Sequence, residues 1–412
     1  MAIVRDPDQQ EQSNGAHPAQ TSQPNGQPCS TSASAAAYTI RNSQKNSTPD
    51  GAHARRQPQR LNVGVVGLGR MGRRHAINIL NHTPRATLIC ACSPAEQDLV
   101  WAREHLVPVG VRVVPSFEEM IETPGLDAVI IASATHLHIS HTTEALDKGL
   151  HVLCEKPICK TLEELENLIE KTQAKQSPSV MVGFVRRFDR DYQDAYDRVR
   201  RGTIGAPVVI RSQGCDTLDT SPFYKQYLAD SGGVFIDTVI HDIDLSLWLF
   251  GGDCKPKSVS AVGVTACHPQ LAEAGDADNA VGICEYWDGK IAFFYNSRTA
   301  AHGYDNATEI FGTAGKLSIN LTPRLNAVEV CDADGYVKTP AHPGWYERYA
   351  SAFVTEANQW VDAVLDNQLV PVPLASALAS LKIATALQES LRTSQKIFFD
   401  ANGNRENEIV RS

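Results

Sequence analysis

The sequence predicts an α/β protein in which a doubly wound parallel sheet is followed by an α+β domain with a mixed, largely antiparallel open sheet. A glycine-rich turn follows the first apolar run of the chain, and strand-like and helix-like segments then alternate. After about Asp189, strand-like segments follow one another with few helices between them. Alternation is typical of a parallel sheet covered by helices, and strands in series are typical of an antiparallel sheet.

The chain is expected to fold as two domains between two tails. At 412 residues it exceeds the size at which one hydrophobic core stops growing. Residues 1–60 are dominated by Gln, Ser, Asn, Pro, Ala and Gly and cannot bury enough apolar surface to offset their ordering entropy, so we predict a disordered tail. We place the first domain at residues 61–188, the second at 189–400 and a short tail at 401–412. A ligand is expected in the cleft between the domains.

The first domain contains strand-like apolar runs separated by amphipathic helical patterns. Such alternation implies a parallel sheet with helices on both faces. The strand-like runs are Leu61–Val66, Thr87–Cys92, Asp127–Ala132, His151–Cys154 and Val180–Phe184. The helical patterns lie after the glycine turn to about Asn81 and near Ala95–Leu106, His138–Lys148 and Leu162–Lys175.

The second domain is expected to hold a longer series of strands. One strong helix is predicted over Asp237–Phe250, and Asp288-Gly289 marks a hairpin turn. Strands are predicted at Val208–Ser212, Lys257–Thr265, Ala280–Tyr286, Lys290–Ser297, Thr308–Phe311 and Ala327–Cys331. Further helices are predicted near Tyr192–Arg201 and, packing back on the core, at Ala350–Asp366 and Leu374–Ser394.

Composition indicates a cytoplasmic protein with a small-molecule partner. The formal net charge of −9 comes from interspersed acidic and basic residues, so no surface for nucleic acid or an anionic membrane is expected. No apolar run reaches the roughly 18 residues of a membrane span, and Met1–Gln12 resembles neither a secretory signal nor a transit peptide. The ten cysteines form no CxxC pair and no disulfide framework, which indicates free thiols in a reducing compartment.

The glycine-rich turn runs from Gly67 to Gly72 in the order Gly-Leu-Gly-Arg-Met-Gly. The pattern is weak alone, but a strand before it and a helix after it indicate the dinucleotide-binding turn of a Rossmann domain. Gly67 permits the tight turn, Gly69 lets the backbone approach a pyrophosphate, and Gly72 allows close packing of helix on strand. The helix N-terminus offers N–H groups to the phosphates. The expected cofactor is NAD or NADP.

The residue that follows the second strand is expected to face the adenosine ribose. NAD-selecting proteins usually carry Asp or Glu there, about 20 residues after the turn. This chain has Cys92-Ser93-Pro94. Ser93 can hydrogen-bond a ribose hydroxyl or a 2′-phosphate but does not repel the phosphate, and no arginine follows before Arg103. The choice between NAD and NADP is therefore open.

The turn Glu155-Lys156-Pro157 follows a buried-looking strand and lies at the carboxyl edge of the predicted sheet. Doubly wound folds bind their ligands at that edge. A lysine there can hydrogen-bond an alcohol oxygen and favour a developing alkoxide. A surface lysine beside a turn proline would have the same sequence, so the turn alone leaves both interpretations open.

Asp237 and His241 are four residues apart, which places them on one face of the expected helix. They are either a helix-stabilising pair or a base whose pKa is tuned by a neighbouring carboxylate. His136 and His138 form an HxH pair, but the further ligands of a zinc site are not apparent nearby. We therefore expect no metal, and read these two histidines as cleft-lining or helix-start residues.

Several segments that occur in order from Leu61 to about Asp400 are specific only when taken together. They are the Gly67–Gly72 turn, Glu155-Lys156-Pro157, Gly183-Phe184-Val185-Arg186-Arg187-Phe188-Asp189, Asp237-Thr238-x-x-His241-Asp242-x-Asp244, Asn296-Ser297-Arg298, Gly303-Tyr304-Asp305 and Phe311-Gly312-x-x-Gly315. In this combination the chain resembles the glucose–fructose oxidoreductase / inositol dehydrogenase superfamily (Gfo/Idh/MocA). The last three segments are similar to its inositol 2-dehydrogenase branch.

The resemblance implies an NAD(P)-dependent enzyme that moves a hydride between nicotinamide C4 and a secondary alcohol of a cyclic polyol, without a metal. It implies that His241 removes the hydroxyl proton, Asp237 orients and tunes His241, and Lys156 holds the substrate oxygen. The implied cofactor contacts are Gly67, Gly69, Arg70, Met71, Gly72, Ser93, Ser133, Thr135, His138, Glu155 and Lys156. The implied polyol contacts are Arg186, Thr238, Tyr304 and, by a looser match, Asp216.

Two departures from the family pattern leave alternatives open. Ser93 stands where Asp is common in NAD-dependent relatives, and His302 stands where some relatives carry Tyr. An inositol 2-dehydrogenase and an NADP(H)-linked sugar or keto-sugar reductase are both compatible, and Ser93 favours the second. A non-enzymatic nucleotide-sensing regulator is the third hypothesis, against which the intact catalytic group argues. The family also implies a homo-oligomer, a dimer or tetramer, formed through the open face of the second sheet.

Overall fold

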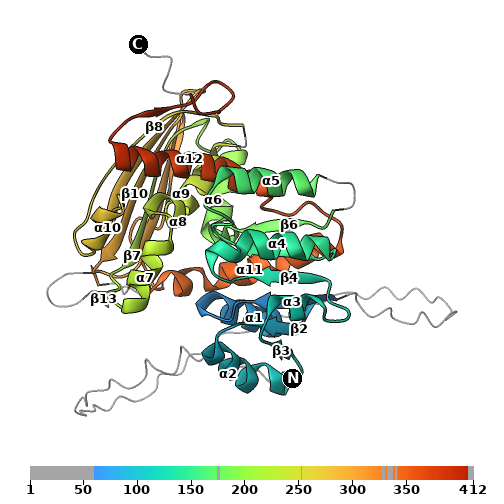
Figure 1. Ribbon diagram of the computed structural model, residues 1–412. Coiled ribbons are helices and arrows are strands. Elements are labelled where there is room, and N and C mark those ends of the chain that lie inside the picture. Colours follow the sequence, from blue (N-terminus) through green and yellow to red (C-terminus); the bar gives the residue numbers. More distant parts are fainter. Residues whose placement is uncertain are drawn as a thin grey trace, which may run out of the picture. The chain divides into compact units, whose positions relative to one another are not determined.

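The computed structural model describes residues 60–173, 177–251, 253–326, 330–331, 337–338 and 341–406 (Figure 1). The first predicted tail lies outside these residues except for Arg60. The end of the second predicted tail, from residue 407, and most of the strand expected at Ala327–Cys331 lie outside them as well.

A parallel six-stranded sheet in the order β3-β2-β1-β4-β5-β6 confirms the predicted first half. The order runs outward from β1 in both directions, which is the doubly wound arrangement. Its strands are near-continuous apolar runs because helices cover both faces. The elements are β1 (Leu61–Val66), α1 (Arg70–His82), β2 (Ala86–Cys92), α2 (Glu96–His105), β3 (Arg112–Val114), α3 (Phe117–Ile121), β4 (Ala128–Ile131), α4 (His138–Asp147), β5 (His151–Glu155), α5 (Leu162–Thr172) and β6 (Val180–Gly183).

The strand β3 and the helix α3 were not predicted from the sequence. β3 has three residues and begins at the exposed Arg112, so no apolar run marks it. α3 has five residues, too few for a helical period to be visible. Its start does carry a signal, because the Ser116 side chain accepts a hydrogen bond from the backbone N–H of Glu119 at 3.2 Å.

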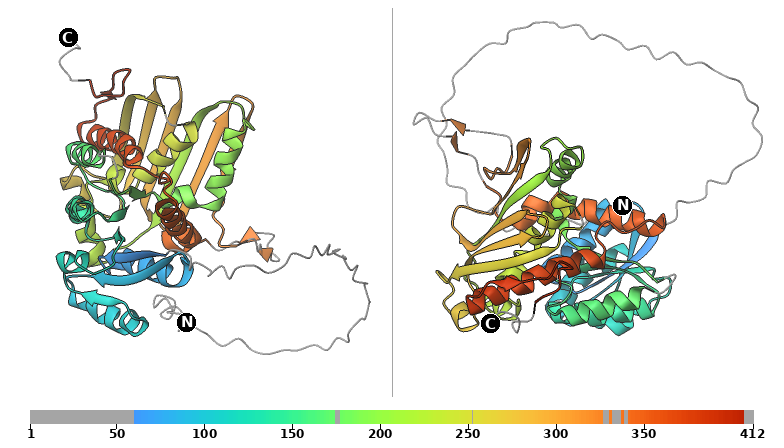
Figure 2. Two further views of the ribbon diagram at one scale, coloured as in Figure 1. Left: turned by 90° about the vertical axis from the view of Figure 1, so that its right-hand side faces the viewer. Right: turned by 90° about the horizontal axis from the view of Figure 1, so that it is seen from above.

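A seven-stranded sheet in the order β12-β11-β7-β10-β9-β8-β15 forms the second half. β7 and β10 pair in parallel and the other neighbours are antiparallel, which confirms the predicted mixed sheet. The helices α9 and α12 pack on one of its faces (Figure 2). The elements are η5 (Val185–Phe188), α6 (Arg190–Arg200), β7 (Pro207–Thr217), α7 (Pro222–Asp230), α8 (Val234–Asp237), α9 (Ile240–Phe250), β8 (Pro256–Val264), α10 (Gln270–Glu273), β9 (Asn279–Tyr286), β10 (Ile291–Ala300), β11 (Asp305–Gly312), β12 (Gly315–Ile319), β13 (Val330–Cys331), β14 (Val337–Lys338), α11 (Trp345–Leu365), α12 (Leu374–Thr393) and β15 (Ile397–Phe398).

The single helix predicted over Asp237–Phe250 is wrong, because the chain forms two helices there. α8 ends at Asp237 and α9 begins at Ile240. The backbone N–H of Val239 bonds to the carbonyl oxygen of Val234 at 3.0 Å, a spacing wider than that of a regular α-helix. The four-residue spacing of Asp237 and His241 therefore does not place them on one continuous helix.

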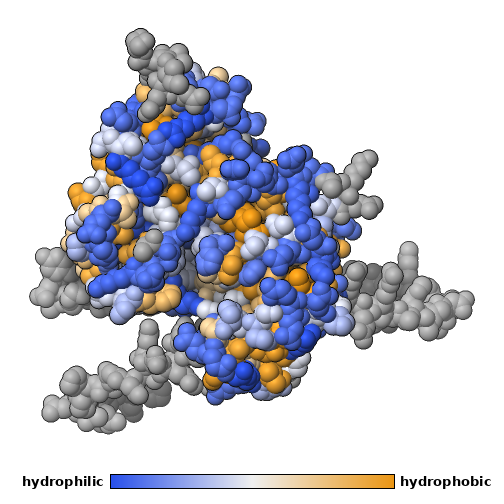
Figure 3. Space-filling model, viewed as in Figure 1, coloured by the Kyte–Doolittle hydropathy of each residue, from blue (hydrophilic) through white to orange (hydrophobic). Residues whose placement is uncertain are grey.

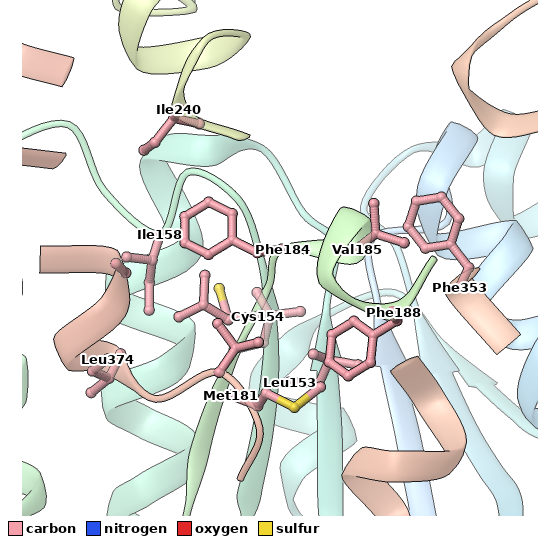
Figure 4. Close-up of a cluster of buried hydrophobic side chains, with 14 of the residues drawn as sticks. Leu153, Cys154, Ile158, Met181, Phe184, Val185, Phe188, Ile240, Phe353 and Leu374 are labelled. Carbon is pink, nitrogen blue, oxygen red and sulfur yellow. The ribbon is translucent and has the colours of Figure 1, made fainter. Parts of the chain in front are cut away.

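The two closing helices join the halves of the described chain. α11 packs on α1 and η5, and α12 packs on α5, β6, α8, α9 and β8. Figure 4 shows the hydrophobic cluster at this junction, to which Leu153 of β5, Met181 of β6, Ile240 of α9, Phe353 of α11 and Leu374 of α12 all contribute. A close-packed core of this kind fixes the positions of the elements around it.

Candidate active site

The glycine turn lies between β1 and α1 and leaves room for a phosphate group. Gly67 has a φ of +83°, and a Cβ there would lie 2.6 Å from the carbonyl oxygen of Ala132. A Cβ at Gly72 would lie 1.6 Å from the carbonyl oxygen of Gly67, whereas a Cβ at Gly69 would meet no described atom within 4 Å. The first turn of α1 has no acidic residue and its N-cap is a glycine, so its N–H groups face no carboxylate of that turn. These residues fit the pyrophosphate of a dinucleotide.

A cavity of about 290 Å³ brings most of the predicted site residues together. Both halves of the chain contribute to its wall. The predicted residues that line it are Arg70, Met71, Ser133, Thr135, His138, Glu155, Lys156, Arg186, Asp216, Asp237, Thr238, His241 and Tyr304. Four predicted cofactor contacts, Gly67, Gly69, Gly72 and Ser93, do not line it.

Lys156 and Asp237 meet across this cavity. The Lys156 Nζ lies 2.7 Å from the backbone oxygen of Asp237 and 3.3 Å from its Oδ1. The Tyr227 hydroxyl donates to Oδ1, and the Arg298 Nη2 donates to Oδ2 at 3.4 Å. Burial favours a higher pKa of Asp237, but the charges of Lys156 and Arg298 and the hydrogen bond from Tyr227 outweigh it and lower that pKa. Asp237 is thus an ionised carboxylate that anchors the Lys156 ammonium.

Burial favours a neutral His241 ring, and the groups that shift the pKa of this ring do not include Asp237, so the tuning of His241 by Asp237 stays a prediction. Its Nδ1 is buried without a hydrogen-bond partner among the described residues, and its ring packs edge-on against Phe184 with the centroids 5.9 Å apart. Burial, followed by the positive charges of Lys156 and Arg186, holds the pKa of His241 well below its ordinary value. A neutral imidazole can accept a proton, so His241 has the form that a general base requires.

Several other side chains of the lining, which we call the polar wall, offer hydrogen-bond donors and acceptors. Arg186 Nη1 donates to Asp242 Oδ1 at 2.8 Å, and Arg186 Nη2 donates to the Tyr304 hydroxyl at 3.4 Å. Burial raises the pKa of Asp216, at the end of β7, although Arg186 opposes the shift. The Thr238 hydroxyl donates to Asp237 Oδ2 at 3.4 Å. Such a wall suits a ligand that carries several hydroxyl groups.

His138 and Glu155 support the turn that carries Lys156. The ring nitrogens of His138 lie 2.9 Å from the carbonyl oxygen of Pro157 and 3.0 Å from that of Ser133. Glu155 Oε1 lies 2.8 Å from Nε2 of the buried His75. Both ring nitrogens of His138 therefore contact the backbone. The turn is held by α4, which carries His138, and by α1, which carries His75.

The Ser93 side chain lies in a polar cluster at the end of β2. Ser93 is 2% exposed, and its hydroxyl donates to Asp98 Oδ2 at 2.8 Å. Asp98 Oδ1 accepts from Arg73 Nη2 at 2.9 Å, and Arg73 Nε donates to the carbonyl oxygen of Leu68 in the glycine turn at 2.8 Å. We call Ser93, Asp98 and Arg73 the β2-end cluster. No arginine occurs between Ser93 and Arg103 in the sequence, but Arg73 reaches this position from α1.

Several side chains that line the cavity were not predicted from the sequence. Tyr224 and Tyr227 line the cavity from α7, for which no helix is predicted. The signal for α7 is Ser221 before Pro222, because Ser is a favoured N-cap and Pro a favoured first helical residue. Trp345, Tyr349 and Phe353 also line the cavity, and their spacing of four residues on α11 marks one helix face.

Metal ligation and membrane insertion find no support in the described residues. No group of three or more His, Cys, Asp or Glu side chains within them is arranged to hold a metal ion. None of the helices they form is long and apolar enough to cross a membrane. The His302 side chain is 62% exposed, lies 3.2 Å from Asp305 and is not part of the cavity lining.

Two family models match the chain, and together they cover more than half of it. Residues 61–184 match the model described as an oxidoreductase family with an NAD-binding Rossmann fold, and residues 192–318 match the GFO/IDH/MocA C-terminal domain. The chain belongs to this oxidoreductase family. The predicted family, fold class and oxidoreductase activity on CH–OH groups are therefore confirmed.

The relatives match most of this chain and nearly all of their own length. The chain is 30% identical over 338 residues to the myo-inositol 2-dehydrogenase of Thermotoga maritima, spanning 82% of this chain and 98% of that protein. It is 32% identical over 343 residues to the scyllo-inositol 2-dehydrogenase (NAD(+)) of Bacillus subtilis, spanning 82% and 96%. The crystal structure of scyllo-inositol dehydrogenase from Lactobacillus casei with bound NAD(H) and scyllo-inositol has a TM-score of 0.77 and 34% identity, spanning 82% and 99%.

Proposed function

We propose that this oxidoreductase oxidises one ring hydroxyl of an inositol to a ketone, with NAD as the hydride acceptor. The observation that carries the proposal is the cavity in which the Lys156 ammonium, the neutral His241 ring and the polar wall around Arg186 converge. A cyclic polyol needs a proton acceptor at one hydroxyl and hydrogen-bonding groups around the others. The names of the relatives support the substrate class.

The proposed mechanism assigns one task to each side chain at the reacting hydroxyl. The bound nicotinamide supplies the C4 atom that accepts the hydride from the alcohol carbon. His241 takes the hydroxyl proton, because burial keeps its ring neutral before the reaction. Lys156 donates a hydrogen bond to the substrate oxygen and offsets the negative charge that develops there. Asp237 keeps the Lys156 ammonium oriented through contacts at 2.7 and 3.3 Å.

The remaining ring hydroxyls are proposed to bind the polar wall. Arg186 and the Tyr304 hydroxyl provide donors, and Asp216 provides an acceptor at the end of β7. A site built from such groups discriminates strongly against an analogue that lacks a hydroxyl, because the buried polar group is then left unpaired. We propose that this wall, and not the exposed His302, determines which stereoisomer of the polyol binds.

We propose NAD rather than NADP because of the β2-end cluster. The carboxylate of Asp98 lies beside Ser93, where the 2′-phosphate of NADP would approach. The guanidinium of Arg73, which a phosphate would need, is already paired with that carboxylate at 2.9 Å. Binding of NADP would require Arg73 to leave Asp98, so the expected discrimination is modest.

The second candidate is an NADP(H)-linked sugar or keto-sugar reductase, and Arg73 is the observation that favours it. The Arg73 side chain is 32% exposed, so its ion pair with Asp98 is open to exchange with a phosphate. A change of partner would turn the β2-end cluster into a phosphate site. The catalytic group of the cavity would serve reduction of a ketone equally well.

An absorbance assay of the reduced nicotinamide tests both candidates. A panel of inositols and sugars is offered with NAD and NADP, and keto-sugars with NADH and NADPH. We expect inositol oxidation with NAD to be the fastest reaction. Turnover confined to keto-sugars and NADPH would establish the second candidate instead. Dinucleotide binding without any turnover would indicate the regulator.

We also propose that the protein is a homo-oligomer that pairs through the open face of the second sheet. Val262, Val281 and Tyr295 lie side by side across β8, β9 and β10, and Ile291 and Phe311 flank one strand on the same face. Val262 is 66% exposed. For comparison, the face of the molecule seen in Figure 3 is mostly hydrophilic, with scattered hydrophobic groups. A contiguous exposed apolar surface is typical of an interface. Light scattering should give a dimer or tetramer, and a monomer would contradict the proposal.

A cytoplasmic location is proposed from the thiols. Eight cysteines are free thiols, and all of them except Cys267 are buried: Cys90, Cys92, Cys154, Cys159, Cys215, Cys254, Cys267 and Cys284. Free thiols persist in reducing compartments.

A further inference from the structure

Arg298 is a fully buried cation that lies behind the cavity and not in its wall. It sits on β10 with a side chain that is 0% exposed, and it is absent from the cavity lining. Its Nη1 lies 3.0 Å from Asp276 Oδ2, and its Nη2 lies 3.4 Å from Asp237 Oδ2. A buried charge is costly unless it is paired, so the two carboxylates determine where this guanidinium lies.

The two carboxylates lie at opposite ends of the short helix α8. Asp276 Oδ1 accepts a hydrogen bond at 2.9 Å from the backbone N–H of Val234, the first residue of α8. Asp237 is its last residue. Arg298 bridges the two and thereby ties both ends of α8 to β10.

We propose that Arg298 is a positioning residue of the hydride-transfer reaction: it keeps the Asp237 carboxylate ionised and in place, so that Asp237 holds the Lys156 ammonium at the substrate oxygen. The proposal rests on the function proposed above and adds a residue that touches neither substrate nor cofactor. Along this line the charges alternate from Asp276 through Arg298 and Asp237 to Lys156. Without Arg298, Asp276 would lose its buried ion-pair partner, and Asp237 would keep its ion pair with Lys156 alone.

The groups around Asp237 show why Arg298 matters to its charge. Burial favours a higher pKa of Asp237, and the positive charges of Lys156 and then Arg298 lower it. Loss of Arg298 therefore raises the pKa of Asp237, and a protonated Asp237 no longer attracts Lys156 by charge. The charged or titratable groups that act on Asp237 or respond to it are Lys156, Asp216, Tyr224, Tyr227 and Arg298.

The split between kcat and KM tests the proposal with a matched control. Arg298→Met and Arg298→Lys are compared with Arg187→Met, because Arg187 also forms an ion pair with a buried carboxylate, at 2.6 Å with Asp244, but does not line the cavity. In Arg298→Met kcat should fall by about 10-fold, because the carboxylate that holds Lys156 loses a charged partner. The KM for the dinucleotide should stay within about twofold, as expected when only transition-state interactions are lost. Arg298→Lys should recover most of the lost kcat, and Arg187→Met should lose thermal stability without losing kcat.

An unchanged kcat in Arg298→Met, or an equal loss in Arg187→Met, would overturn the proposal. If Arg298→Met does not fold, Asp276→Asn supplies the test. It leaves the guanidinium to Asp237 alone, so kcat should stay within about twofold of the wild type, and a loss of about 10-fold would overturn the proposal.

A crystal structure of Arg298→Lys or Arg298→Met separates this proposal from the proposed function. Asp237 should lie farther from Lys156 in the Met variant than in the wild type. The same Lys156–Asp237 contact in both would overturn the positioning role, whichever alcohol the enzyme oxidises. A wild type that oxidises no inositol would instead overturn the proposed substrate.

Discussion

We call the proposed catalytic site the catalytic end and the proposed ribose site the adenosine end, and the two are built from different elements. At the catalytic end, Lys156 follows a strand of the first sheet, while Asp237 and His241 come from the second half of the chain. The Asp237 side chain is 7% exposed and the Lys156 side chain is 19% exposed. At the adenosine end, which lies outside the cavity lining, the β2-end cluster belongs to the first half alone, and its Arg73 side chain is 32% exposed.

The difference follows from the strength of charges in each place. An ionic interaction is several times stronger where water is excluded than at the surface, so groups that act on a developing charge must be enclosed. Enclosure here requires elements from both halves of the chain. Groups that only recognise a cofactor can remain partly exposed and exchange partners. We therefore expect changes at the catalytic end to alter kcat, and changes at the adenosine end to alter cofactor preference.

The largest expected effect comes from removing a catalytic group. Lys156→Ala and His241→Ala should each lower kcat by about 10²- to 10⁴-fold, since a general base or a charge-stabilising group contributes about that much. Dinucleotide affinity, measured by fluorescence titration, should survive in His241→Ala. His302→Ala is the control, because its exposed side chain lies away from the cavity lining. Near-normal turnover in His241→Ala would remove that residue from the role of base.

A change at the adenosine end should leave kcat nearly intact. In Asp98→Ala, the negative charge is lost and Arg73 is free to bind a 2′-phosphate. The ratio of kcat/KM for NADP to that for NAD should rise by about 10- to 100-fold, as one charge-assisted hydrogen bond and one lost repulsion are each worth about 1.4 kcal/mol or more. The double variant Asp98→Ala/Arg73→Ala should lose this gain. An unchanged ratio in Asp98→Ala would place the ribose elsewhere.

Ser93→Asp should move the preference in the other direction. It adds a second carboxylate beside Asp98, where a 2′-phosphate would be repelled. The same kinetic ratio should fall by about tenfold, equivalent to about 1.4 kcal/mol. A wild-type preference for NAD beyond about a thousandfold would indicate that another residue reads the ribose.

The two ends also differ in how far the sequence predicts them. The glycine turn and the turn of Lys156 each follow a near-continuous apolar strand, so their place at the edge of the sheet can be predicted from local pattern. The partners of Asp237 cannot, because Arg298 is 61 residues away in sequence and reaches it only through the second sheet. The break between α8 and α9 cannot be predicted either, because the apolar pattern continues across it.

The β2-end cluster shows the same limit at shorter range. Ser93 alone suggests an undecided cofactor preference, because Ser neither repels nor strongly binds a phosphate. The fold adds Asp98 from the first turn of α2 and Arg73 from α1. Neither residue directly follows the second strand, where the residue that contacts the ribose is expected. The local sequence therefore does not indicate that Asp98 and Arg73 meet there.

The Tyr227 hydroxyl offers a smaller test of the catalytic end. It donates to Asp237 Oδ1, and this hydrogen bond helps to lower the pKa of Asp237. Tyr227→Phe removes one hydrogen bond to a charged group and leaves Lys156 and Arg298 in place. kcat should fall by about 10-fold, which corresponds to about 1.4 kcal/mol for such a bond. Lys225→Ala is the control from the same helix, because Lys225 is exposed and does not line the cavity, and an equal loss there would indicate a general effect of α7 and not of the bond to Asp237.

The smallest expected effect is the response of the wild type to moderate acid. This response shows whether burial or a neighbouring carboxylate controls the pKa of His241. A histidine tuned by a neighbouring carboxylate would have a raised pKa and would lose its function as a base when the pH falls below about 7. Burial and the charges of Lys156 and Arg186 instead lower the pKa of His241, so the ring stays neutral until the pH is well below the ordinary value of about 6.5. The kcat/KM for the polyol should therefore change by less than about twofold between pH 8 and pH 6.5, because a base titrating below this range is already neutral throughout it. The profile is measured with saturating NAD in a buffer series of constant ionic strength. A midpoint near pH 7 that is absent from His241→Gln would show that the carboxylate and not burial controls this ring.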